Sequence, residues 1–165
     1  MNFPNAQNVN CDNIARYLDK KKFEVHTMYT NKKAIDKKVY KDQDIHLHKL
    51  IHHRFIWYWS KYLTMLLGNY DVYYLPKVEK TDKRFSQKHK NKICISSVEG
   101  VITESTNNTE QFKDYYIKDM TSFFSISNCI ADSVKKYWGI QSEVIPLGTI
   151  PIGKKVDEKN KLKNI

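Results

Sequence analysis

The 165-residue chain has the composition of a globular protein: 41% of its residues are hydrophobic, 28% are charged and 13% are aromatic. That length suffices for one domain with a buried core, and the composition argues against a disordered chain. Lys and Arg number 28 against 18 Asp and Glu, which gives a formal net charge of +10. The excess favours polyanionic partners such as anionic lipid headgroups, phosphorylated substrates or nucleic acid, and it equally fits a protein with many surface lysines.

Cysteine usage and hydropathy indicate a reducing, non-secreted setting. Cys11, Cys94 and Cys129 are far apart, odd in number and without a CxxC pair. Neither a disulfide framework nor a zinc site is therefore indicated. The sequence has no signal-peptide pattern and no run of about 18 apolar residues, so we expect a cytoplasmic protein.

Helical and strand patterns alternate in the first half of the chain. Apolar residues recur at helical spacing after Asn10, which we expect to cap a helix of about ten residues. Strand formers alternate over 23–29 and 44–50, on either side of a lysine-rich connection. An apolar stripe then predicts a helix that ends at Gly68. The stripe consists of Phe55, Ile56, Trp59, Tyr62, Leu63, Leu66 and Leu67. The residues expected on the outer side of this helix are Arg54, Trp57, Tyr58 and Lys61.

The second half continues the alternation. A short apolar strand over 71–75 precedes a polar connection, 77–91, and a strand over 92–98. Apolar residues spaced by four predict a helix before "SFFSIS", and the last helix ends at Gly139, ahead of a final strand in "SEVIP". Strands separated by helices in this way predict an α/β fold of the Rossmann-like, doubly wound kind. Its sheet would be mostly parallel, with helices on both faces.

Several histidines lie close together in the sequence. His46 and His48 share one face of their expected strand, and His52 and His53 follow at the start of the next helix. Side chains at i and i+2 could hold a metal ion, but a half-buried strand also accommodates histidine. We predict structural or surface roles for these residues, with a metal site as the alternative.

The segment "RFIWYWSKYL" mixes basic and aromatic side chains, as single-strand nucleic-acid platforms do. Its helical periodicity is better explained by core packing. No G-x-G-x-x-G or G-x-x-x-x-G-K pattern occurs, so a nucleotide-binding loop of that kind is absent. Nucleic acid is therefore not the partner we expect.

Glu99 and Gly100, in "SSVEGV", follow the carboxyl end of an expected parallel strand. Doubly wound folds bind their ligands at this edge of the sheet. The Glu99 carboxylate could accept a proton or hold a sugar hydroxyl. An exposed carboxylate on a strand-end turn explains the same pattern equally well.

Four segments follow one another in a recognisable order, and together they cover most of residues 2–150. They are "NFPNAQNVNCDNIARYLDKKKFEVHTMY", "YDVYYLP", "ICISSVEGV" and "FFSISNCIADSVKKYWGIQSEVIPLG". This succession resembles the amino-terminal half of family 4 type glycosyltransferases of the GT-B fold. The last segment is the most specific, with a strand ending in Ser-x-Ser, a helix, a glycine and a strand ending "VIPLG".

The resemblance implies an enzyme that moves a sugar from a nucleotide-diphosphate donor to a glycan or a lipid-linked acceptor. Residues 1–152 would be its acceptor-side domain, and residues 153–165 a linker or tail toward an absent donor-binding domain. This domain would bind no cofactor itself and would be inactive without the donor-binding domain or a second polypeptide. Because lipid-linked acceptors reside at anionic membranes, peripheral association with the inner face of the membrane is a further prediction.

The sequence departs from the family pattern at two places. The family opens with a buried strand and a glycine-rich turn, whereas Met1 here directly precedes "NFPN". We therefore expect a sheet without its first central strand, unless another segment fills the gap. Many relatives carry a histidine at the end of the fifth strand, where this sequence has Glu99 and Gly100. A carboxylate there could orient an acceptor hydroxyl or act as a base, which makes Glu99 the candidate catalytic residue.

The resemblance also suggests which residues line the cleft. Asn5, Asn8 and Asn10 would contribute amides from the first loop and helix, with Glu99 and Gly100 opposite. Ser127, at the end of a strand, is predicted to cap the last helix, with cleft contact as the alternative. A different class of function stays open: a non-catalytic α/β module whose basic surface binds nucleic acid, anionic lipid or a protein. An inactive remnant of a split gene is a third possibility.

Overall fold

The computed structural model describes residues 6–30, 37–51, 53, 56–76, 79–107 and 110–146. Asn5 and the expected tail at 153–165 lie outside these residues. Within them the strands are β1 (Val25–Tyr29), β2 (Ile45–Lys49), β3 (Val72–Tyr74), β4 (Ile93–Val98), β5 (Ser122–Ser125) and β6 (Glu143–Val144). The helices are α1 (Ala6–Tyr17), α2 (Lys37–Asp42), α3 (Trp57–Gly68), α4 (Lys80–Lys88), α5 (Glu104–Asn107), α6 (Glu110–Asp114), the π-helical turn η2 (Tyr115–Asp119) and α7 (Asn128–Trp138).

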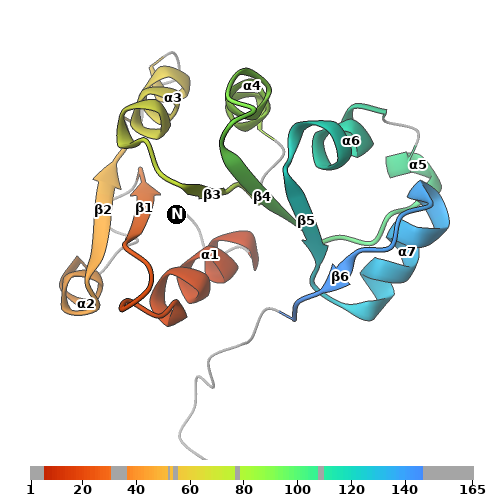
Figure 1. The fold of residues 1–165 in the computed structure, drawn as a ribbon, viewed down its shortest axis with the longest axis horizontal. Helices are drawn as coiled ribbons and strands as arrows, with labels where there is room; N and C mark the ends of the chain where they lie inside the picture. Colours follow the sequence, from red (N-terminus) through yellow and green to blue (C-terminus); the bar gives the residue numbers. More distant parts are fainter. Residues whose placement is uncertain are drawn as a thin grey trace, which may run out of the picture.

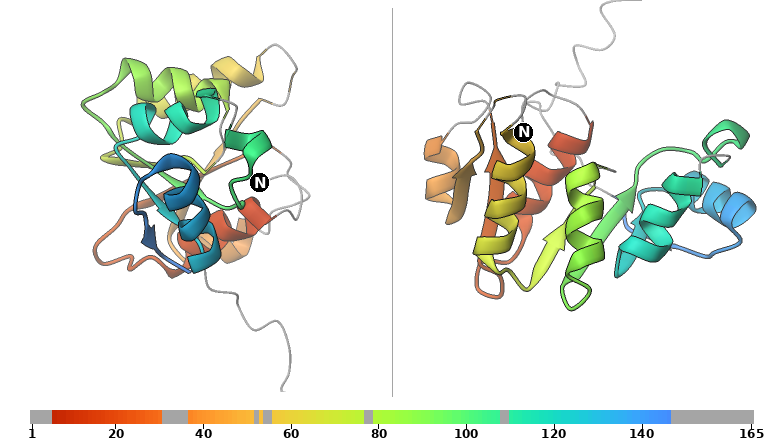
Figure 2. Two further views of the ribbon diagram at one scale, coloured as in Figure 1. Left: turned by 90° about the vertical axis from the view of Figure 1, so that its right-hand side faces the viewer. Right: turned by 90° about the horizontal axis from the view of Figure 1, so that it is seen from above.

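The fold is α/β, with parallel pairing between all neighbouring strands of the described sheets, which confirms the predicted class. Helices α3, α4 and α6 lie along one face, and α1 and α7 lie along the other (Figure 1). The view from above in Figure 2 shows α3, α4 and α6 side by side on their face. Each strand-to-strand connection contains a helix, as crossovers between parallel strands usually do.

The strands form two sheets instead of one. Strands β1 and β2 pair with each other, while β3, β4, β5 and β6 form the second sheet in that order. Among the described residues no backbone pairing joins β1 to β3. The break lies in the middle of the strand series, between β1 and β3 (Figure 1).

Two hydrophobic clusters follow this division. The larger one fills the space around the four-stranded sheet, with Val98, Val134 and Tyr115 fully buried at its centre. The smaller one joins β1 and β2 to α1 and α2 through Ala15 and Tyr40, among others. Met28 on β1 packs against the larger cluster, so side chains connect the two sheets where backbone hydrogen bonds do not.

The ends of two helices differ from expectation. Helix α1 already begins at Ala6, so Asn10 lies inside the helix and does not cap it. Asn8 also lies within α1 and not in a preceding loop. Helix α3 includes Gly68 as its last residue, and Asn69 makes the left-handed turn, with φ of 45°. A Cβ atom at Gly68 would overlap the ring of Tyr70, which explains a glycine there.

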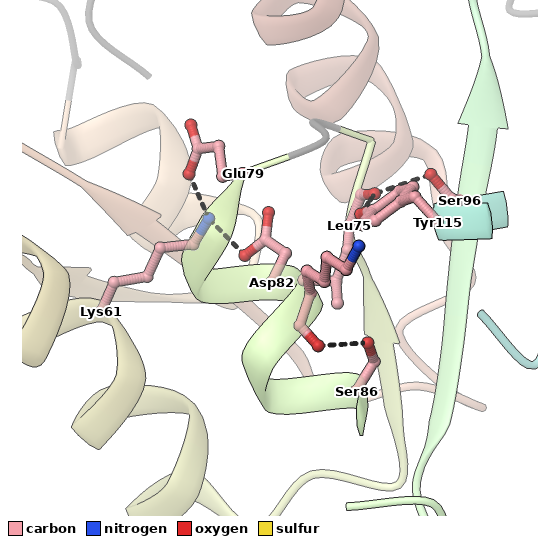
Figure 3. A network of polar contacts seen from close by, with 8 residues as sticks. Lys61, Leu75, Glu79, Asp82, Ser86, Ser96 and Tyr115 are labelled. Atoms are coloured by element: carbon pink, nitrogen blue, oxygen red, sulfur yellow. Dashed lines mark hydrogen bonds and ion pairs between the residues drawn. The ribbon is translucent and has the colours of Figure 1, made fainter. Parts of the chain in front are cut away.

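The prediction of which side of α3 is buried was wrong. Lys61, expected outside, is 9% exposed, whereas Trp59 is 53% and Leu67 is 79% exposed. Lys61 faces α4, where its ammonium group lies 2.6 Å from Glu79 and 2.5 Å from Asp82 (Figure 3). The ion pair, and not the apolar stripe, determines which side of α3 is buried, because a carboxylate buried on α4 needs a cation opposite it.

Helix α4 itself was missed and had been assigned to a polar connection. Its buried residues are Thr81, Asp82, Phe85 and Ser86, of which Phe85 alone is apolar. A helix whose buried side is mostly polar leaves no hydrophobic periodicity for a sequence pattern to detect. Helix α2, in the lysine-rich connection, was missed for the same reason: Tyr40 is its one buried residue.

Candidate functional site

The candidate site lies where strands β3 and β4 end. Tyr74 is the last residue of β3, Ser97 lies near the end of β4, and Glu99 follows that strand. The Tyr74 hydroxyl lies 2.7 Å from the Ser97 hydroxyl, which in turn donates to Oε1 of Glu99 at 3.0 Å. Parallel pairing of β3 with β4 sets these ends side by side. The result is a chain of three polar groups at the carboxyl edge of the sheet.

The second carboxylate oxygen of Glu99 has no such partner. Oε2 is inaccessible to solvent, and no described residue gives it a hydrogen bond. A carboxylate oxygen removed from water without a partner is costly, so a hydroxyl or N–H donor of a ligand would satisfy it once a local side-chain movement opened the way to it. Ser97 already holds the other oxygen, which fixes the orientation of the group.

Two tyrosines around Glu99 stay protonated. Burial, together with the negative charge of Glu99, raises the pKa of Tyr74 and that of Tyr116. The Tyr116 hydroxyl donates to the carbonyl oxygen of Ser97 at 3.3 Å. Among the described side chains, no Lys or Arg is hydrogen-bonded to Tyr74, Ser97 or Glu99. The site therefore offers neutral donors and one carboxylate, which suits hydroxyl groups better than phosphates.

Gly100 leaves space beside this group. It is exposed, and a Cβ atom built on it would meet no heavy atom within 4 Å beyond its chain neighbours. The backbone after Glu99 is therefore open to an approaching ligand. The prediction that Glu99 and Gly100 lie at the carboxyl end of a parallel strand is confirmed.

Ser127 has a structural role. It is the N-cap of α7, and its hydroxyl accepts a hydrogen bond from the Ile130 N–H at 3.4 Å. This confirms the predicted cap. Contact between Ser127 and a ligand in the cleft stays a prediction.

Of the predicted asparagines Asn8 and Asn10, the structure describes the side chain of Asn10 alone. Asn10 lies in α1 and is half-buried, while the side chain of Asn8 lies outside the described residues. The next residue, Cys11, is close enough to Tyr74 to contribute to the raised pKa of that tyrosine. That Asn10 lines a ligand cleft stays a prediction.

Sequence reasoning missed Tyr74 and Ser97 as members of this site. Both lie in runs that read as buried strand, "DVYYL" and "ICISS". The sequence did carry a signal for them, since serines and a tyrosine hydroxyl at the ends of adjacent strands need polar partners there.

A surface hollow of about 370 Å³ lies elsewhere, on α2 and β2, and does not include Glu99. Its lining residues are Lys37, Lys41, Asp44, Ile45, His46 and Leu47.

Comparisons with known proteins do not assign this chain to a family. No family model matches it, and no significant match was found among curated proteins or solved structures. Across the part of the chain that the structure describes, no helix has the length and apolar character needed to traverse a lipid bilayer.

Proposed function

We propose that this chain is the acceptor-side domain of a glycosyltransferase and that Glu99 binds a hydroxyl group of the acceptor. One observation carries the proposal: the Tyr74–Ser97–Glu99 chain ends in a solvent-inaccessible carboxylate oxygen with no described partner. Ligands of doubly wound folds bind at this edge of the sheet. The order of sequence segments that resembles the GT-B glycosyltransferases supports the choice of a sugar over other polyhydroxyl ligands.

The proposed chemistry uses Glu99 as an acceptor of hydrogen bonds and, during transfer, of a proton. A carboxylate that accepts a hydrogen bond from the attacking hydroxyl can remove its proton as the new glycosidic bond forms, while the bond between the donor sugar and its diphosphate breaks and the nucleoside diphosphate leaves. Tyr74 and Ser97 would keep the carboxylate in one orientation. The nucleotide-sugar donor would be bound by a separate donor-binding domain or polypeptide.

The first prediction concerns binding of the acceptor. The full chain, screened against soluble glycans and short lipid-linked sugars by saturation-transfer NMR, is expected to bind at least one of them. Glu99→Gln should then weaken binding by about tenfold or more, because a hydrogen bond to a charged group contributes about 1.5–3 kcal/mol. Titration of the best glycan gives the two dissociation constants.

Glu143→Gln is the matched control, since Glu143 lies exposed on β6. It should bind the glycan as the unchanged protein does. Equal affinity of Glu99→Gln and the unchanged protein would contradict the role of Glu99. If no glycan binds and single-stranded nucleic acid binds with a steep loss of affinity in salt, the basic binding module would be the correct function.

Membrane association belongs to the same proposal, and helix α3 supplies the surface for it. Its exposed apolar side chains include Trp59, Leu63 and Leu67. The neighbouring helix α4 contributes basic residues, and the Arg84 guanidinium lies 5.9 Å from the centre of the Trp59 ring. An exposed apolar group beside cations matches the interface of an anionic bilayer, where apolar side chains insert and Lys and Arg meet the headgroups.

We therefore predict that the protein sediments with vesicles containing anionic lipid and much less with neutral vesicles. Leu67→Ser should lower the partition coefficient by about tenfold, because inserting a Leu side chain contributes about 1.5 kcal/mol or more. Leu18→Ser is the matched control, as Leu18 is also exposed but lies after α1. Equal sedimentation with both kinds of vesicle would contradict the membrane assignment.

A further inference from the structure

Three histidines and a glutamate gather on one face of the two-stranded sheet, apart from Glu99. In the parallel register of β1 and β2, His26 lies opposite His46, and Met28 lies opposite His48. Alternation along each strand puts His26, His46 and His48 on the same face. Glu24 immediately precedes β1. Strand pairing therefore unites residues that are about twenty positions apart in the sequence.

The Glu24 carboxylate is the centre of this group. Its Oε1 lies 3.1 Å from Nε2 of His26 and 3.4 Å from Nε2 of His46. One ligand atom from each of the three residues lies within 4.8 Å of the others. Ligand atoms around a tetrahedral Zn²⁺ are about 3.3 Å apart, given metal–ligand distances of about 2.0–2.1 Å. The two distances from Glu24 are close to this spacing, so rotation of the side chains, without rearrangement of the strands, would bring the three ligand atoms around a shared metal ion.

The other ring nitrogen of His26, Nδ1, also has a hydrogen-bond partner. Nδ1 of His26 lies 2.9 Å from Nε2 of His48, and the same His48 atom lies 3.1 Å from the Tyr70 hydroxyl. With a proton on Nδ1 donated to His48, the lone pair on Nε2 of His26 points toward Glu24 and is free for a metal. Ligating histidines usually have such an outer hydrogen bond, which fixes both tautomer and ring orientation.

Packing also restricts the His26 ring. Its centre lies 4.7 Å from that of His46, 5.2 Å from that of His48 and 4.6 Å from that of Tyr70. The His26 side chain is 21% exposed and His46 is 49% exposed, so one ligand is anchored and the other borders solvent. A metal ion at this place would keep a coordination position open to water.

We propose that Glu24, His26 and His46 form a binding site for a divalent transition metal ion of the Zn²⁺ type. Two imidazole nitrogens and one carboxylate oxygen suit Zn²⁺, Co²⁺, Ni²⁺ or Cu²⁺ and do not suit Mg²⁺ or Ca²⁺, which prefer oxygen ligands alone. The strand register carries this inference independently of the glycosyltransferase proposal. Without a metal, the same contacts are ordinary side-chain contacts between two histidines and a carboxylate.

The test is calorimetric titration of the full chain, prepared without a polyhistidine tag, with ZnCl₂ at a pH near 7.5. We expect one Zn²⁺ per chain at this site. His26→Gln and Glu24→Gln should each weaken binding by about tenfold or more, since even outer partners of a metal site contribute about 10–100-fold. Glu24→Gln is informative because Glu24 is 71% exposed, so its replacement should not disturb folding.

Two controls separate this site from other metal ligands. Cys129→Ser serves as the parent protein, because Cys129 is an exposed thiol that could bind Zn²⁺ by itself. His53→Gln removes an exposed histidine outside the proposed site and should leave the affinity unchanged. The proposal is overturned if the parent protein takes up no Zn²⁺ in a saturable manner. It is also overturned if Glu24→Gln and His26→Gln, shown to be folded by circular dichroism, bind Zn²⁺ as tightly as the parent.

Discussion

Lys61→Met is expected to lower the free energy of unfolding by about 3–5 kcal/mol, the usual cost of leaving one member of a buried ion pair without its partner. Asp82 is 1% exposed and Glu79 is partly buried, and the Lys61 ammonium group lies between them (Figure 3). Burial acts to lower the pKa of Lys61, but the charges of Asp82 and Glu79 and their hydrogen bonds raise it. Lys61 is therefore charged throughout the neutral pH range. Its replacement by methionine removes the cation that the buried Asp82 carboxylate pairs with.

Urea denaturation followed by circular dichroism measures this loss. Lys88→Met is the matched control, since Lys88 is exposed at the end of α4, and it should change stability by less than about 0.5 kcal/mol. The double variant Lys61→Met with Asp82→Leu should recover most of the loss, because both buried charges are then gone. A loss below 1 kcal/mol for Lys61→Met alone would show that α3 and α4 do not pack through this ion pair.

Phe85→Ala is the second change expected to have a large effect, again about 3–5 kcal/mol. Phe85 is 1% exposed and is the apolar residue by which α4 enters the core. Its ring centre lies 4.8 Å from that of Tyr73 on β3 and 5.9 Å from that of Tyr62 on α3. Truncation to alanine removes these contacts and leaves a cavity between the helices and the sheet.

Phe23→Ala provides the comparison, because Phe23 precedes β1 and is 50% exposed. Its replacement should cost no more than about 1 kcal/mol, as for surface side chains that contribute little packing. The same denaturation experiment measures both variants. Similar losses for Phe85→Ala and Phe23→Ala would contradict the placement of α4 as a helix packed on the core.

Much of the fold follows from local patterns. Helix α7 shows why: Ser127 caps its start, Ile130, Val134 and Trp138 form its buried face, and Gly139 ends it with φ of 73°. Each signal acts within one or two turns of helix, so the sequence alone suffices to read it. The parallel class follows in turn from the spacing of such helices between short strands.

Sequence patterns gave wrong predictions where contacts between residues far apart in the chain determine which side chains are buried. No local sequence pattern indicates that the Lys61 side chain is buried, because its partner, the Asp82 carboxylate, lies on another helix. The apolar stripe of α3 is instead left largely exposed, including Leu67. Nor does composition reveal α4, whose buried side consists mostly of hydroxyl and carboxylate groups.

The candidate sites differ in the same way. Glu99 and Gly100 were identified from the sequence, since a strand end can be read locally. Their partner Tyr74 comes from the preceding strand, and strand order decides that contact. The Glu24, His26 and His46 group depends entirely on register, because a shift of one residue between β1 and β2 would turn the two histidines to opposite faces.

Amide chemical-shift mapping with the best-bound glycan is the most direct test of sugar binding at Glu99. We expect the largest shifts on titration at Tyr74, Ser97, Glu99 and Gly100, and we expect Glu99→Gln to suppress them. Shifts confined to α3, or to the β1–β2 face around His26, with the Glu99 amide unmoved, would contradict a sugar-binding role for the carboxyl edge of the sheet.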